Sequence, residues 1–142
     1  MATNLGQLIV RAFYWVDEGL LASLRSGGGP EVTHAQSMII MMIGEDIRRP
    51  SAIAERLGVS RQAVHQSLRH LTDIGIVELV PDPEDGRAKL ARLSRTGAPI
   101  HKRARSILDE LEIELGKRIG ARCVANLRDA LERDWGDPVK LE

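Results

Sequence analysis

The sequence predicts a mainly α-helical chain with one small β-hairpin, in a single domain covering residues 1–142. Apolar residues recur at steps of three and four over most of the chain, which is the spacing of amphipathic helices. Only residues 76–93 hold two short runs that alternate with a period of two, as strands do. Hydrophobic residues make up 43% and charged residues 28%, which is ordinary for a protein with a packed core.

The first predicted helix covers residues 5–26 and ends before Gly27-Gly28-Gly29-Pro30. Thr33 and Gln36 form a capping box, so a second helix begins there. Residues 37–43 are apolar almost all round, and we expect this helix to be central and buried. Gly44 is a suitable C′ residue for it.

A tight helix-turn-helix is predicted next. Residues 47–49 should be extended, because a proline disfavours the α region for the residue before it. Pro50 suits the N1 position of a third helix that ends at Leu57. Only Gly58 and Val59 separate this helix from Ser60, which can cap a fourth helix running to about Ile74.

Residues 76–80 and 88–93 are the two predicted strands, and the turn residues 81–87 join them into a hairpin, or wing. Ser94 is a candidate cap for the fifth helix, and Pro99 at N1 is the other candidate start. Gly120 should end that helix. A last helix should carry an apolar stripe that extends to Trp135.

Residues 33–93 therefore form a predicted winged helix-turn-helix, and residues 5–26 and 94–135 form predicted dimerisation helices. The terminal helices carry apolar stripes at opposite ends of a chain whose middle is already a compact unit. Burying these stripes against each other and against a second copy gives a homodimer. The alternative is a monomer whose terminal helices pack only on its own core.

The net charge is zero, but its distribution is uneven. Residues 48–105 carry twelve basic and six acidic side chains, and both flanking segments are acidic overall. This asymmetry points weakly to a polyanion, against the alternative of a surface that is patchy by chance. A single cysteine excludes an internal disulfide and indicates a cytoplasmic protein. No run is long enough to span a membrane, so we expect no membrane partner. No enzyme motif stands out, and we expect neither a catalytic residue, a cofactor nor a metal site.

Residues 51–64, which read SAIAERLGVSRQAV, closely resemble the MarR family of prokaryotic transcription regulators. Residues 81–88 are similar to the wing of that family, with its Asp-X-Arg at Asp85-Gly86-Arg87. Residues 93–97 resemble the Leu-Thr-X-X-Gly opening of its long dimerisation helix. The resemblance covers residues 5–132, with its specific motifs between Pro50 and Gly97.

The resemblance implies a homodimer that binds a pseudo-palindromic operator in double-stranded DNA, here as a repressor. It also implies frequent release by a small molecule or an oxidant. Two departures from the family pattern stand out. Residues 78–80 read Glu-Leu-Val where members often carry basic residues, and Gly86 stands where an arginine is common. Both departures remove potential contacts to phosphate.

The fourth helix is the predicted recognition helix, because its polar side chains suit base edges in the major groove. Arg87 at the tip of the wing suits the negative potential of a minor groove. An ordinary solvated helix face, and a local Asp85–Arg87 surface pair, are the alternatives. Weaker candidates, for contacts to the DNA backbone, are Lys89, Arg92, Arg48 and Arg49. The predicted DNA-binding residues are Ser60, Arg61, Gln62, Ala63, His65, Gln66, Arg69, Arg87 and Lys89.

The family resemblance also places a ligand pocket between the dimerisation helices and the winged domain, for an effector of unknown identity. We expect it to be lined by Tyr14, Trp15, His34 and Met38, with ordinary core packing as the alternative. Cys123 is either a redox sensor or a small buried or interface residue. For the whole chain, the alternative function is a winged-helix protein-interaction module, such as an antirepressor, that does not bind DNA.

Overall fold

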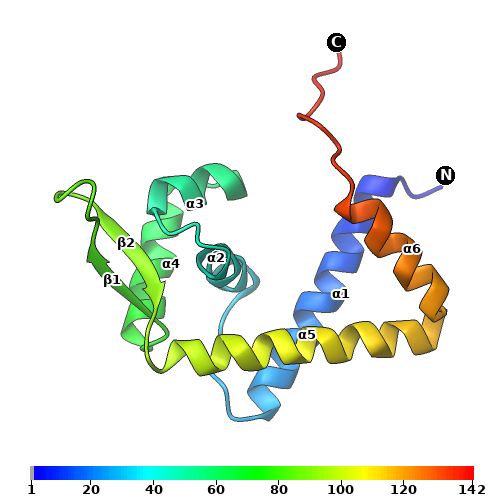
Figure 1. Ribbon diagram of the computed structural model, residues 1–142, viewed down its shortest axis with the longest axis horizontal. Helices are drawn as coiled ribbons and strands as arrows, with labels where there is room; N and C mark the ends of the chain where they lie inside the picture. The colour runs from blue at the N-terminus through cyan, green and yellow to red at the C-terminus, as the bar shows by residue number, and fades with distance from the viewer. Residues whose placement is uncertain (1) are drawn as a thin grey trace.

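The computed structural model describes residues 2–142, which form six helices and one two-stranded antiparallel sheet (Figure 1). This confirms the predicted fold class. No helix within this range has the length and apolar content that crossing a bilayer requires. The elements in chain order are α1 (Leu5–Ser26), α2 (His34–Gly44), α3 (Pro50–Leu57), α4 (Arg61–Asp73), β1 (Val77–Pro81), β2 (Lys89–Leu93), α5 (Gly97–Ile119) and α6 (Ala121–Glu132).

The helix-turn-helix follows from local chemistry, as the sequence predicted. Pro50 is the first residue of α3, where its missing N–H costs no hydrogen bond. Gly58 ends α3 in the left-handed conformation with φ 65°, which glycine adopts without steric cost. The Ser60 hydroxyl then accepts a 3.0 Å hydrogen bond from the backbone N–H of Ala63 and caps α4.

The main core lies around α2, which crosses the middle of the molecule (Figure 1). Its buried face packs against α3, α4 and the hairpin, so the predicted central position is confirmed. Every large side chain in this cluster that is almost completely buried comes from α3, α4 or the start of the hairpin. These side chains are Ile53, Val64, Leu68, Leu71, Ile76 and Val77.

The hairpin pairs Val77 with Leu93 and Pro81 with Lys89. Its strands begin one residue later than predicted, at Val77 and Lys89. The N–H of Ala91 donates to the carbonyl of Arg48 at 2.9 Å. This bond joins the extended segment before α3 to the free edge of β2.

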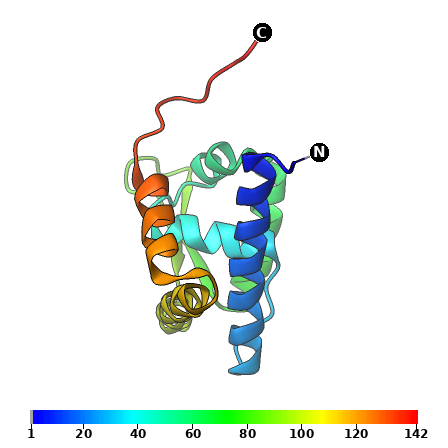
Figure 2. The same cartoon turned by 90° about the vertical axis from the view of Figure 1, so that its right-hand side faces the viewer.

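On the other side of the molecule, α1 packs across α5 through a second, smaller core of Leu20, Leu24 and Ile107. Figure 2 shows α1, α6 and the end of α5 together at this side, away from α4 and the hairpin. Leu5, Leu8 and Val10 of α1 are exposed here, as are Leu127 and Leu131 of α6.

Two predicted details at helix ends are wrong. Gly44 is the last residue of α2 and not its C′ residue, and Asp46 adopts the left-handed conformation instead. Of the two candidate starts of α5, the structure favours Ser94, because its hydroxyl accepts from the N–H of Gly97, the first residue of the helix. Trp135 lies beyond the end of α6, where its indole N–H donates to the carbonyl of Ala130.

Candidate nucleic-acid interface

The helix α4 has one buried and one exposed face. Val64, Leu68 and Leu71 are at most 1% exposed and anchor the helix on the core. Ile74, the residue after the end of α4, is 38% exposed. The candidate base-reading and phosphate-binding side chains of α4 are all exposed, on the sides of the helix that face away from the core. They are Arg61, Gln62, Ala63, His65, Gln66 and Arg69.

Ser60 is exposed at the start of α4, and its oxygen is occupied by the cap. Its hydroxyl hydrogen is still free to donate to a phosphate, since a hydroxyl has one donor and two acceptor sites. The predicted contact and the observed cap are therefore compatible.

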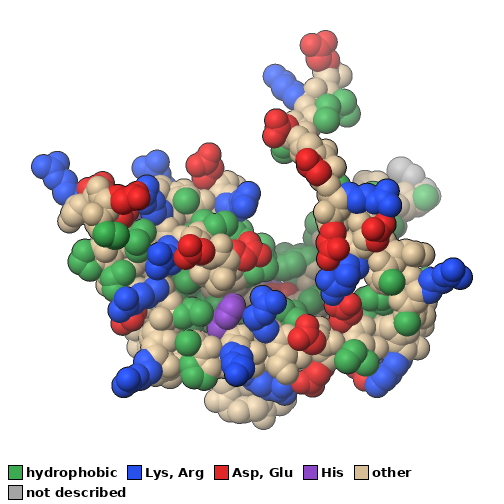
Figure 3. All heavy atoms as spheres, viewed as in Figure 1, with side chains coloured by type: hydrophobic (Ala, Val, Ile, Leu, Met, Phe, Trp, Pro, Cys, Tyr) green, Lys and Arg blue, Asp and Glu red, His purple; other side chains and the backbone are tan. Residues whose placement is uncertain are grey.

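Arg87 is exposed in the loop between the two strands. The carboxylate of Asp85 accepts from the backbone N–H of Arg87 at 3.1 Å, and the carbonyl of Asp85 accepts from the N–H of Ala88 at 2.9 Å. Asp85 thus shapes the loop and does not hold the Arg87 guanidinium. Lys and Arg side chains stand out at this tip of the molecule in Figure 3.

The ion pairs divide the cationic candidates. Arg48 pairs with Asp46, Arg49 with two carboxylates of the hairpin loop, and Arg92 with Glu78 directly opposite it on β1. Three of the four weaker candidates therefore carry neutralised charges. Within residues 2–142, no ion pair involves the fourth, Lys89, or the cations that the sequence favoured, Arg61, Arg69 and Arg87.

Comparison with known proteins shows which family this arrangement is similar to. A sequence profile of the MarR family matches residues 31–88, from just before α2 through most of the hairpin. The transcriptional regulator AdcR of Streptococcus pneumoniae is 32% identical over 69 residues, 49% of this chain and 47% of that protein. An HTH-type transcriptional regulator of Mycobacterium tuberculosis is 30% identical over 86 residues, 61% of this chain and 60% of that protein. The match thus spans about half the length of the curated relatives.

Solved structures extend the likeness to nearly the whole chain. Wild-type MarR from E. coli, in its apo form, superposes with a TM-score of 0.75 at 28% identity and covers 93% of this chain and 97% of that one. The chain is therefore similar to the MarR family in sequence over residues 31–88 and in fold over nearly its whole length. A MarR variant from E. coli complexed with operator DNA gives a TM-score of 0.69 at 29% identity, covering 90% and 91% of the two chains. MarR-family proteins are transcriptional regulators and not enzymes.

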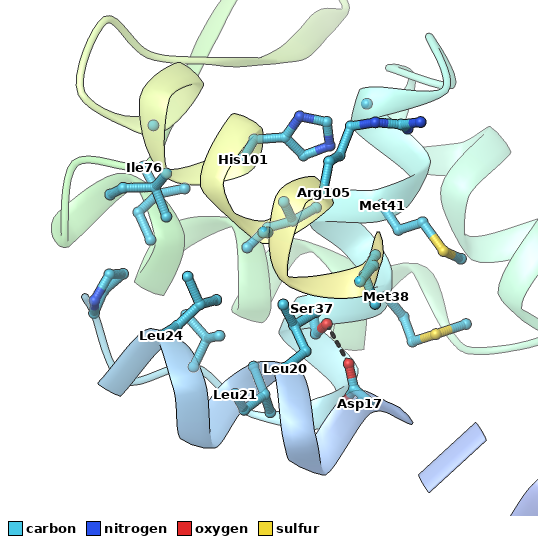
Figure 4. A pocket seen from close by; sticks show the side chains of 18 of the residues that line it. Asp17, Leu20, Leu21, Leu24, Ser37, Met38, Met41, Ile76, His101 and Arg105 are labelled. Carbon is cyan, nitrogen blue, oxygen red and sulfur yellow. Dashed lines mark hydrogen bonds between the residues drawn. The ribbon is translucent and has the colours of Figure 1, made fainter. Parts of the chain in front are cut away.

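A cavity of about 330 Å³ lies between α1, α2 and α5. Leucines of α1 line one side of it, and α2 contributes Met38 and Met41 (Figure 4). His101 and Arg105 of α5 stand on the opposite side. The lining of the cavity is mostly apolar and contains a few polar groups. Small-molecule sites generally have a lining of this composition.

Of the four predicted pocket residues, only Met38 lines this cavity. Trp15 faces a different groove, between α1, α5 and α6, under the guanidinium of Arg118. His34 binds the buried carboxylate of Asp17, and Tyr14 packs edge-on against the His34 ring at 5.1 Å. Tyr14, Trp15 and His34 do not line this cavity, and their predicted place in a ligand pocket stays a prediction.

The sequence interpretation missed His101 and Arg105. The available signal was their spacing: they lie four residues apart, each one position after a residue of the apolar stripe, Ile100 and Ala104. Burial lowers the pKa of His101, and the neighbouring cation of Arg105 lowers it further. His101 is therefore mainly neutral at pH 7.

Cys123 is exposed near the start of α6, not buried. No three His, Cys, Asp or Glu side chains within residues 2–142 gather closely enough to hold a metal ion.

Proposed function

We propose that this protein is a sequence-specific DNA-binding transcriptional repressor that acts as a homodimer in the cytoplasm. In this proposal α4 enters the major groove, and the nine candidate residues make the contacts. Gln62, His65 and Gln66 read base edges, while Arg69 and Lys89 bind phosphates. Arg87 reaches into the neighbouring minor groove.

One observation carries the proposal: the exposed polar face of α4 lies beside a wing in which Arg87 and Lys89 form no ion pair with any of residues 2–142. Base edges in the major groove require such exposed donors and acceptors. A structural neighbour at 29% identity forms a complex with operator DNA, which supports the same use of the fold here. Glu78, which argued against phosphate contacts, forms an ion pair with Arg92 at 2.7 Å, so its charge is locally compensated.

The homodimer follows from the exposed apolar side chains of the terminal helices. Large apolar side chains on α1 and α6, together with Ile113 and Ile119 of α5, are 38–67% exposed on this single chain. Contiguous apolar surface of this kind marks an interaction site. A symmetric pair of copies would bury it and would present two α4 helices to successive major grooves, about 10 base pairs apart.

The effector in this proposal is a small, mainly apolar molecule that binds the cavity between α1, α2 and α5. Its leucine and methionine lining suits an apolar body, and His101 with Arg105 suits a polar or anionic end. Binding there would reduce the affinity for DNA.

The proposal is tested by selection from a randomised DNA duplex pool, followed by affinity measurements at several salt concentrations. We expect a two-fold symmetric motif and an affinity that falls steeply with salt. Gln62→Ala should relax specificity at one half-site position at a cost of about 1–3 kcal/mol. Arg87→Ala should weaken binding to all sequences and make the salt slope shallower by about 0.9 per lost phosphate contact.

Arg122→Ala is the matched control, since Arg122 is an exposed arginine at the far end of α5 from the wing. It should leave both motif and affinity unchanged. Retention of no motif, with weak binding that salt does not change, would contradict the proposal and favour a protein-interaction module. Equal loss on every sequence for Gln62→Ala would contradict its role as a base reader.

A further inference from the structure

The segment before α3 and the loop of the hairpin are joined by one arginine. Arg49, the residue just before α3, donates from Nε to the Oδ2 of Asp82 at 2.8 Å. Its Nη2 donates to the Oε2 of Glu84, also at 2.8 Å. The partners lie 33 and 35 residues away in the chain, so this clamp connects two parts of the molecule that no local pattern links. We define the Arg49 clamp as Arg49, Asp82 and Glu84.

Asp82 is the buried end of the clamp, with only 3% of the residue exposed. Its second carboxylate oxygen accepts from the backbone N–H of Glu84 at 2.9 Å, and its own N–H donates to the carbonyl of Ala88. The Glu84 N–H and the Arg49 guanidinium lower the pKa of Asp82, although burial opposes them. Asp82 is therefore a charged group, fixed where the hairpin opens from β1 into its loop.

Arg87 is a cation of the same loop and follows Asp82 and Glu84 in the chain. Asp85 holds the backbone of Arg87, and no ion pair within residues 2–142 holds its guanidinium. The backbone of Arg87 is thus held in place, while its guanidinium has no ion-pair partner within residues 2–142. The hairpin loop that carries Arg87 is held in place relative to α3, and hence to α4. Arg49, which binds this loop, directly precedes α3, and the carbonyl of the neighbouring Arg48 accepts a hydrogen bond from β2.

We propose that Arg49 and Asp82 are positioning residues for DNA binding. They set the distance and angle between the wing and α4, so that Arg87 and the α4 side chains meet one duplex together. Neither residue contacts DNA in this proposal. The inference rests on the proposed DNA-binding function.

The direction in which Asp82→Asn changes the affinity for DNA distinguishes a positioning role of Arg49 from direct contact with DNA. If Arg49 bound a phosphate, Asp82→Asn would free its charge and strengthen binding. If Arg49 positions the wing, Asp82→Asn removes half of the clamp and weakens binding, even though it removes a negative charge near a polyanion. Arg49→Lys adds a second distinction, because lysine keeps the charge but lacks the planar fork that binds two carboxylates at once.

The experiment measures the affinity of the full chain for its selected duplex, for Arg49→Gln, Arg49→Lys, Asp82→Asn and the double variant Arg49→Gln/Asp82→Asn. We expect each of the four to bind about tenfold more weakly, with the double variant no weaker than the single ones. Each loss should shrink when Arg87→Ala is added, because a misplaced wing matters only while Arg87 is present. Arg103→Gln is the matched control, since Arg103 forms an exposed pair with Glu110 on α5 at the same 2.8 Å.

Amide hydrogen exchange of residues 82–88 in the free protein supplies a readout that does not depend on DNA. Exchange should accelerate there in Asp82→Asn while α4 stays protected. Glu84→Gln breaks only the exposed arm of the clamp and serves if Asp82→Asn fails to fold.

Tighter binding of Asp82→Asn would overturn the inference, and so would wild-type affinity in Arg49→Lys or in all variants. A wild-type protein that binds no duplex would instead overturn the proposed function, and the two failures are therefore distinguishable.

Discussion

Gly97 shows how tightly one residue can be constrained. A Cβ built on Gly97 would lie 2.0 Å from the carbonyl oxygen of Ile76. Real Cβ atoms do not approach a backbone oxygen so closely, and neither backbone can yield without moving α5 or the hairpin. Glycine is therefore required at this junction for space.

We expect Gly97→Ala to lower the free energy of unfolding by about 1–3 kcal/mol or more, as overpacked substitutions do. Denaturant unfolding monitored by circular dichroism measures it. Gly86→Ala is the control, because a Cβ there meets nothing within 4 Å. An equal and small effect of both substitutions would contradict the close packing of Gly97.

His101 makes the stability of the protein depend on pH. Its pKa in the folded protein is below the ordinary 6.5, so the unfolded chain takes up a proton first as the pH falls. Above pH 6.5 His101 is neutral in both the folded and the unfolded chain, so it does not change the free energy of unfolding. Below pH 6.5 its contribution to that free energy declines down to the pKa in the folded protein and then stays level.

We therefore expect the melting temperature to fall between pH 7 and pH 5, and to fall less in His101→Gln. Thermal melts at a series of pH values measure this. His65→Gln, at an exposed histidine, should keep the wild-type decline. A decline that His101→Gln leaves unchanged would refute the assignment.

At the scale of elements, the recognition helix depends on its cap. The Ser60 hydroxyl satisfies the N–H of Ala63, one of the four N–H groups that lack a partner inside the helix. Ser60→Ala should cost about 1 kcal/mol of stability, and Ser60→Asn should restore most of it, since asparagine also caps. Urea unfolding of the free protein measures this without DNA. A loss that asparagine does not restore would point to a role other than capping.

The sequence predicted elements well wherever their limits are local. Pro50, Gly58 and Ser60 define the helix-turn-helix through interactions within a few residues, and the structure confirms them. The start of α5 was predictable only as two candidates, Ser94 and Pro99. Ser94 prevails, and its hydroxyl also donates to the carbonyl of Gly75 across the junction, which no local pattern shows.

The candidate interface was predictable in part for the same reason. The exposed face of α4 follows from helical periodicity, and the position of Arg87 follows from turn chemistry. The Arg49 clamp joins residues more than 30 positions apart. The inward direction of His101 depends on how α5 packs against α2, where a Cβ on Gly44 would lie 2.5 Å from the His101 ring. Local patterns carry neither kind of information.

At the scale of the whole molecule, the apolar side chains of α1 and α6 are exposed on a single chain. Leu131 of α6 is 51% exposed. Leu131→Glu should convert the proposed dimer to a monomer and weaken operator binding, because a buried unpaired charge opposes association. Sedimentation equilibrium measures the mass. Leu79→Glu, on the outer side of the hairpin, should leave the dimer intact, and a monomeric wild-type protein would overturn the prediction.

The junction between β2 and α5 has a mechanical consequence. Only three residues separate the two elements, and Ser94 and Gly97 fasten them to the end of α4 and the start of the hairpin. The 23 residues of α5 therefore act as a rigid lever arm about 35 Å long. If its distal end is the pivot, a tilt of about 5° moves the hairpin by about 3 Å, which is close to the spacing of successive base pairs. A small change of angle at the terminal helices would thus shift the wing by one step along a DNA groove.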